Sequence, residues 1–137
     1  MAPELMYPSK FNLPSPRLSR EVDIYAFGMS MYEVVTGVRP FGAEGMRKEE
    51  LMFVVMEGGR PAKPSNAEAI GLGNGVWDLM EKCWSQDRTQ RPGSWNVRLR
   101  LRVAASLSPE APPGPRIEIP LNRNISTCST TSNAYCK

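Results

Sequence analysis

The 137-residue chain contains no histidine, and this absence excludes several common kinds of active site. Histidine is the usual general base near neutral pH and the commonest metal ligand. Without it the chain cannot form a Ser-His-Asp or Cys-His catalytic arrangement. The composition therefore disfavours ordinary hydrolase chemistry and typical zinc sites.

Cysteines and long apolar runs are also scarce. Cys83, Cys128 and Cys136 are an odd number with no Cys-x-x-Cys spacing, which indicates neither a disulfide framework nor a metal knuckle. No apolar run approaches the ~20 residues that a membrane-spanning helix needs. Met1 is followed by Ala-Pro-Glu, whereas a secretory signal has a basic and then an apolar stretch. We therefore expect a cytoplasmic protein with no membrane contact.

The charge balance is close to neutral. Lys and Arg number 17 against 14 Asp and Glu, a net charge of +3, which is too small to indicate a nucleic-acid partner. Arg98, Arg100 and Arg102 could form a basic patch, but such a group on a helix is more typical of a solvated surface. We expect no binding of nucleic acid.

Prolines and glycines divide the apolar residues into short segments, which favours several helices within one domain. Three prolines between Tyr7 and Leu18 predict an irregular loop, after which the first helix is expected. This helix runs from Glu21 to Thr36, capped by Ser19 and closed by Gly37. Its middle is apolar on nearly every face, so we expect it to lie at the centre of the domain with neighbours on all sides.

Three further helices are expected. One runs from about Arg47 to Glu57, and another begins after a cap at Asn74. A fourth element spans Trp95 to about Ser106. Arginine alternates with apolar residues from Arg98 to Val103, and this period of two would also allow a strand. Pro, Ser, Thr and Asn dominate residues 108–137, which we expect to be a disordered tail. The apolar stripe of the helix after Asn74 consists of Val76, Leu79, Met80, Cys83 and Trp84.

Several short motifs follow one another in an order that resembles the second half of the C-terminal lobe of a eukaryotic protein kinase, of the tyrosine-kinase-like group. The resemblance covers Met1 to about Ser106. It implies a mainly α fold, a partial protein-kinase-like C-lobe of about four helices over residues 1–107, and it favours a helix for the fourth element. The motifs are Met1-Ala2-Pro3-Glu4, Asp23-Ile24-Tyr25-Ala26-Phe27-Gly28, Thr36-Gly37-Val38-Arg39-Pro40-Phe41, Gly59-Arg60-Pro61, and Lys82-Cys83-Trp84 followed by Asp87, Arg91 and Pro92.

The resemblance implies structural roles for four residues. Glu4 is expected to form a buried ion pair with Arg91; the alternative is two unrelated surface charges. Asp23 matches the aspartate that holds the catalytic loop of a kinase; the alternative is a plain acid in a first helical turn. Trp84 and Cys83 could form a reactive thiol beside an aromatic ring, but their helical spacing predicts that both are core residues.

The residues that perform phosphoryl transfer are absent from the sequence. A kinase needs a glycine-rich loop, a lysine paired with a glutamate, a catalytic aspartate, and metal-binding Asp and Asn residues. We therefore assign no catalytic, cofactor-binding or metal residue here, although ATP and Mg are implied for the complete domain. We expect Met1 to be an internal methionine taken as a start, and the chain to be inactive alone.

Two functions remain open. The chain is either a fragment of a protein kinase that phosphorylates Ser/Thr (or Tyr) of a protein substrate in signalling, or a non-catalytic truncated kinase or pseudokinase remnant that binds a partner protein. The oligomeric state is left open.

Overall fold

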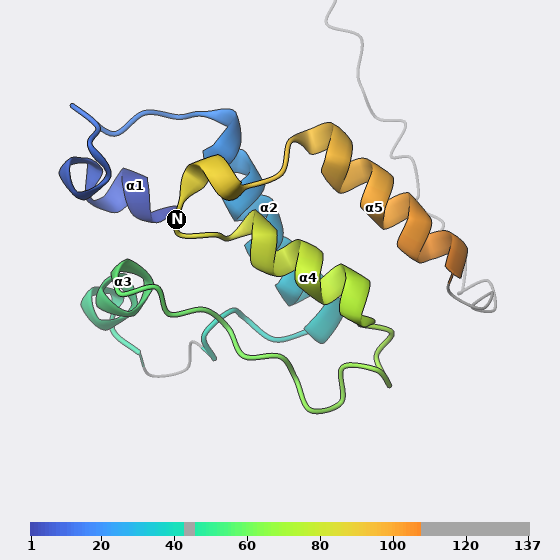
Figure 1. The fold of residues 1–137 in the computed structure, drawn as a ribbon. Helices are drawn as coiled ribbons and strands as arrows, with labels where there is room; N and C mark the ends of the chain where they lie inside the picture. Colours follow the sequence, from blue (N-terminus) through green and yellow to red (C-terminus); the bar gives the residue numbers. More distant parts are fainter. Residues whose placement is uncertain (43–45, 108–137) are drawn as a thin grey trace, which may run out of the picture.

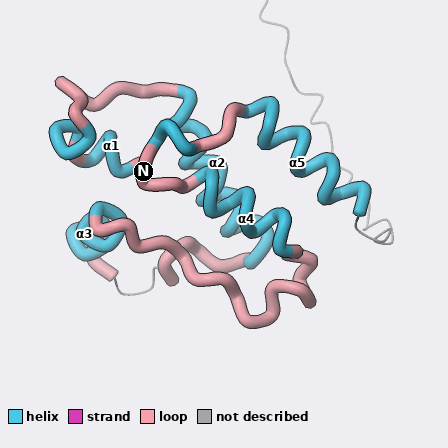
Figure 2. The backbone as a smooth tube through the Cα atoms, viewed as in Figure 1, coloured by secondary structure: helices cyan, strands magenta, loops and turns pink. Residues whose placement is uncertain are grey.

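The structure, a computed structural model, describes residues 1–42 and 46–107. Within these residues the chain is helical and contains no strand, which confirms the mainly α fold (Figures 1 and 2). The predicted disordered tail, residues 108–137, lies outside the described residues. The helices are α1 (Pro3–Met6), the 3-10 helix η1 (Pro8–Phe11), α2 (Arg20–Thr36), α3 (Lys48–Met56), α4 (Asn74–Cys83), the 3-10 helix η2 (Arg88–Gln90) and α5 (Ser94–Leu107).

The start of the chain differs from the sequence prediction. The helix from Glu21 was expected to be the first, but α1 and η1 precede it. Pro3 and Pro8 each occupy the first position of one of these short helices. Proline is favoured there because its fixed φ suits the helix and its missing N–H has no partner to lose. The prolines between Tyr7 and Leu18 therefore start one turn as well as interrupting longer helices.

The bounds of α2 agree with the prediction to within one residue. Ser19 is the N-cap residue in an extended conformation, but its side chain makes no capping hydrogen bond to the helix, and Gly37 follows the helix with φ of +69°. The N–H of Gly37 donates to the carbonyl of Glu33, which closes the last turn. Glycine suits this position because a left-handed backbone carries no Cβ penalty there.

α4 lies between α2 and α5 (Figure 1). Leu79, Met80 and Cys83 on α4 are fully buried, as their spacing predicted. Gly28 on α2 allows the close approach, because a Cβ added there would lie 2.8 Å from the Cβ of Cys83. Asn74 is the first residue of α4 and Gly73 is the N-cap, so the predicted cap was one residue too late. The side chain of Asn74 instead accepts a hydrogen bond from Lys63.

A long loop joins α3 to α4 (Figure 2). Its packing depends on Leu72, which is fully buried although it stands between Gly71 and Gly73. The N–H of Leu72 donates to the carbonyl of Ala67, which is also buried. Burial of Ala67 and Leu72 fixes the position of this part of the loop, although its glycines by themselves would indicate flexibility.

Residues Ser94–Leu107 form a helix, so the strand alternative for this segment is excluded. Val97 on its inner side is buried. Arg98, Arg100 and Arg102 are all exposed, as a solvated surface requires. Steps of two residues cannot share one face of a helix, which explains why the alternation in sequence was a poor guide here.

Within the described residues, α2 has neighbours on only part of its surface. Val22, Tyr25 and Met31 are buried, but another stripe of the helix is open to solvent. Val34 is 82% exposed and Phe27 is 40% exposed. The reason is geometric, because within the described residues the other elements pack on the opposite side of α2. The exposed stripe, which we call the α2 outer face, consists of Asp23, Ala26, Phe27, Ser30 and Val34.

No helix among residues 1–42 and 46–107 combines the length and the apolar character needed to cross a bilayer.

Candidate functional site

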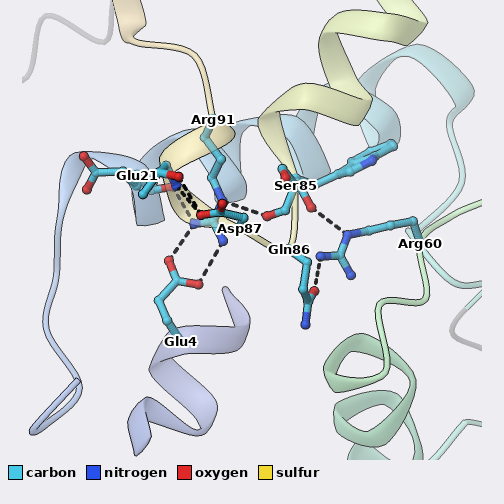
Figure 3. A network of polar contacts seen from close by, with 9 residues as sticks. Glu4, Glu21, Arg60, Ser85, Gln86, Asp87 and Arg91 are labelled. Carbon is cyan, nitrogen blue, oxygen red and sulfur yellow. Dashed lines mark hydrogen bonds and ion pairs between the residues drawn. The ribbon is translucent and has the colours of Figure 1, made fainter. Parts of the chain in front are cut away.

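The structure brings Glu4 and Arg91 together although they are far apart in sequence (Figure 3). Nη1 of Arg91 donates to Oε1 of Glu4 at 2.5 Å, and Nη2 donates to Oε2 at 2.9 Å. Both side chains are almost completely buried. A guanidinium donates two parallel hydrogen bonds to one carboxylate in this geometry, the strongest form of a protein ion pair.

Arg91 also joins two further segments of the chain. Its Nε donates to the carbonyl of Ser85 at 3.0 Å, and Nη1 donates to the carbonyl of Glu21 at 2.9 Å (Figure 3). Glu21 belongs to the first turn of α2, and Ser85 follows α4. Most of the donors of the guanidinium are therefore satisfied, as burial of its charge requires. One side chain connects α1, α2 and the loop after α4.

The approach of Arg91 to this position depends on η2. The Asp87 carboxylate accepts a hydrogen bond from the N–H of Thr89 and caps the 3-10 helix that precedes Arg91. This hydrogen bond and a second one from the hydroxyl of Thr89 lower the pKa of Asp87 below its ordinary value. The capped turn directs the chain so that Arg91 points back toward α1.

Two opposing effects set the ionisation of Glu4. Burial by itself would raise its pKa, but the hydrogen bonds and the positive charge of Arg91 outweigh burial. The pKa of Glu4 therefore lies below its ordinary value of 4.5. The carboxylate is charged at neutral pH, and the pair is ionic.

Arg60 is a second, half-buried arginine with a structural role that the sequence pattern did not predict. Its Nε donates to the carbonyl of Trp84 at 2.7 Å, and its Nη2 donates to the side chain of Gln86 (Figure 3). Gln86 in turn donates to the carbonyl of Met56, at the end of α3. The sequence signal for this role is the Gly59-Arg60-Pro61 motif, which places an arginine shortly after the end of α3.

The ring of Tyr25 lies close to both arginines. The guanidinium carbon of Arg91 lies 5.0 Å from the ring centroid, and that of Arg60 lies 5.4 Å from it. Cations at these distances are attracted to an aromatic face. Burial raises the pKa of the Tyr25 hydroxyl, against the opposing effect of both arginines. This hydroxyl is buried and has no hydrogen-bond partner among the described residues.

The other residues singled out from the sequence occupy different environments. Asp23 is exposed in the first turn of α2, where an acid is favoured by the helix dipole. Trp84 is buried with its ring edge against Trp77 at a centroid distance of 5.7 Å. Burial raises the pKa of the Cys83 thiol to about 11, which makes it a poor nucleophile. Trp84 and Cys83 are therefore core residues.

A pocket of about 440 Å³ lies between α1, α2 and α3. Most of its lining is apolar, with Met6, Met29 and Leu51 among the contributors, and Lys48 and Arg39 also line it. Such a surface suits apolar groups better than a triphosphate, which requires a glycine-rich loop and metal-binding acids. Across the part of the chain that the structure describes, no group of three or more His, Cys, Asp or Glu side chains is placed to hold a metal ion.

Three features define the helical base of a protein-kinase lobe: an Ala-Pro-Glu segment held by an ion pair, a long helix after it, and an arginine that returns to the glutamate of that segment. The family model described as protein tyrosine and serine/threonine kinase matches residues 1–101. The chain therefore belongs to the protein kinase family.

Individual kinases from animals and plants are similar to this chain. The proto-oncogene tyrosine-protein kinase ROS of Rattus norvegicus is 29% identical over 109 residues, covering 79% of this chain and 4% of that protein. Mitogen-activated protein kinase kinase kinase 7 of Homo sapiens is 33% identical over 92 residues, 67% of this chain and 13% of that protein. The serine/threonine/tyrosine-protein kinase HT1 of Arabidopsis thaliana is 30% identical over 98 residues, 71% of this chain and 22% of that protein. The chain thus spans less than a quarter of each of these relatives.

Proposed function

We propose that this chain is the helical base of a protein kinase domain whose complete form transfers phosphate from ATP to Ser/Thr (or Tyr) of a protein substrate. The observation that carries the proposal is the buried, bidentate Glu4–Arg91 pair. In this function Glu4 ends the activation segment, the loop that helps to form the substrate site of a kinase. The complete protein acts in cytoplasmic signalling.

The role of the chain in that reaction is to hold the activation segment in place. Arg91 bonds Glu4 on α1 and the carbonyl of Glu21 on α2 at the same time. The end of the activation segment, which leads into α1, is therefore fixed relative to α2. Positioning of this kind contributes strongly to phosphoryl transfer, which depends on alignment and charge stabilisation more than on covalent chemistry.

ATP and Mg²⁺ would be bound by other parts of the complete kinase. The described residues offer neither a glycine-rich phosphate loop nor a group of metal-binding acids. Asp23 would contact the catalytic loop of the complete domain, since it is exposed at the start of the α2 outer face. We derive no step of the transfer from residues of this chain.

The test begins with the native transcript, sequenced through its 5′ end and translated in frame upstream of Met1. We expect a glycine-rich loop, the paired lysine and the catalytic and metal-binding motifs. The complete product is then assayed for transfer of labelled phosphate from ATP to a generic protein substrate, beside its Arg91→Met variant. Activity that falls in the variant supports the proposal. An in-frame stop codon before Met1 rules out a kinase in its own right.

The α2 outer face favours a second candidate function. Phe27 and Val34 are exposed on this stripe, whereas the opposite side of the helix is buried. In a complete kinase the rest of the lobe would cover them. In a non-catalytic truncated kinase or pseudokinase remnant, the same face would bind a partner protein, and the in-frame stop codon is the outcome that would favour this function.

A further inference from the structure

The last helix, α5, has an apolar face that the other described elements leave uncovered. Val97 and Leu101 pack against the core on its inner side. Trp95 is 65% exposed and Leu107 is 78% exposed on the outer side. Residues four apart share one side of a helix, so these exposed side chains form one stripe. This α5 outer face consists of Trp95, Leu99, Val103 and Leu107.

Positive charge lies along the edge of this face. The guanidinium carbon of Arg98 lies 4.6 Å from the ring centroid of Trp95, and Arg102 follows one turn later. α5 contains no acidic residue. Among residues 1–42 and 46–107, neither arginine forms an ion pair. A segment that combines apolar side chains with a carboxylate would therefore complement the face.

We propose that the segment Arg116–Leu121 of the same chain binds the α5 outer face. Ile117, Ile119 and Leu121 alternate with other residues, so they lie on one side of the segment when it is extended. Pro120 and the prolines before Arg116 disfavour a helix there. In the proposed contact Glu118 projects from the opposite side of the extended segment, where the long side chains of arginines at the edge of the face can meet its carboxylate.

The length of chain between the two elements permits this contact. Ile117 follows Leu107 by ten residues, which span up to about 33 Å when extended. The stripe from Trp95 to Leu107 is about 18 Å long at the α-helical rise. The segment can therefore turn back to any part of the face, and its apolar residues, which span about 13 Å when extended, cover most of the stripe. Because it is tethered, its effective concentration is in the millimolar range, and a weak intrinsic affinity is enough for binding.

The three tryptophans of the chain give a direct measurement, because Trp77 and Trp84 are buried whereas Trp95 is on the proposed contact. The full chain is compared with a variant that carries Ile117→Asp, Ile119→Asp and Leu121→Asp, using acrylamide quenching of tryptophan fluorescence. We expect the variant to show a severalfold larger quenching constant and a red-shifted emission. Trp95→Phe should remove this difference. Ile125→Asp, a matched change outside the segment, should leave quenching unchanged.

A charge exchange tests the ionic part of the contact. Glu118→Arg should raise the quenching constant, and adding Arg102→Glu should restore it toward the wild-type value. Equal quenching in the wild-type chain and the triple variant would overturn the proposal. Protection of Trp95 that disappears on dilution would indicate a second copy of the chain as the occupant. Protection that requires anionic lipid vesicles would indicate a membrane surface, and either result would also overturn the proposal.

Discussion

Arg91 shows how much a single residue can contribute to the architecture. Its guanidinium contacts α1, α2 and the loop after α4, and it lies over the ring of Tyr25. A lysine could not reproduce these contacts, because its ammonium group has no planar fork of donors. The effects expected at the residue scale follow from this geometry.

Replacing Arg91 with methionine should destabilise the chain severely. The change leaves the Glu4 carboxylate buried without its partner, a situation that typically costs about 3–5 kcal/mol. The free energy of unfolding is measured by urea denaturation of the wild-type chain and the variant. Where the single variant fails to fold, the double variant Glu4→Gln/Arg91→Met should recover part of the stability, since no isolated charge remains.

Lys10→Met provides the matched control. This change also removes a cation from an ion pair, but Lys10 and Glu57 are both exposed. Pairs of that kind contribute about 0–1 kcal/mol. Similar losses of stability in Lys10→Met and Arg91→Met would show that burial of the Glu4–Arg91 pair has no special energetic role.

The stability of the chain should fall in acid. Glu4 has a pKa below 4.5 in the folded chain, so the unfolded state binds more protons in this range. Its contribution is present above the unfolded pKa and is lost as the pH falls through the folded pKa. Unfolding free energies measured between about pH 6 and pH 3 should decrease more steeply for the wild-type chain than for Glu4→Gln/Arg91→Met. Parallel curves would contradict the assignment to Glu4.

At the scale of elements, the contact between α2 and α4 depends on the absence of a side chain at Gly28. A Cβ there would lie 2.8 Å from the Cβ of Cys83, too close for van der Waals contact. Gly28→Ala should therefore push the two helices apart and cost about 1–3 kcal/mol. Thermal unfolding followed by circular dichroism measures the loss.

The same substitution at Gly75 should change the stability of the chain in the opposite direction. Gly75 belongs to α4, and a Cβ added there would meet nothing within 4 Å. Gly75→Ala should stabilise the chain by about 0.4–1 kcal/mol, because alanine loses less backbone entropy on folding. A loss of stability at both glycines would indicate a general sensitivity to substitution, unrelated to the α2–α4 contact.

For the whole molecule, the uncovered α2 outer face is the feature with the largest consequence. Exposed apolar stripes of this kind promote association or aggregation. We expect the 137-residue chain to self-associate when concentrated, and Val34→Lys to reduce this association without lowering the free energy of unfolding. Sedimentation velocity measures the first effect and urea denaturation the second.

Ala69→Lys adds the same charge at an exposed position away from α2 and serves as the control. It should leave self-association unchanged. A wild-type chain that stays monomeric and unfolds in one sharp transition would count against the expectation.

The sequence was a good guide wherever a local signal determined the structure. Gly37 marked the end of α2, and the spacing of Leu79, Met80 and Cys83 marked the inner side of α4. It was a poor guide at the start of the chain, because a proline can begin a helical turn as well as interrupt one. The structural role of Arg60 was not predicted, since its partners, the carbonyl of Trp84 and the side chain of Gln86, are far from it in sequence.

By itself, the sequence determined the helical character of the chain, most helix bounds and the resemblance to a protein kinase, because these depend on local spacing and on motif order. Tertiary structure decided which sides of α2 and α5 are covered, and it placed the buried Arg91 and the half-buried Arg60 beside the ring of Tyr25. Burial and hydrogen-bond partners depend on segments far apart in the chain, and for that reason only the folded molecule specifies them.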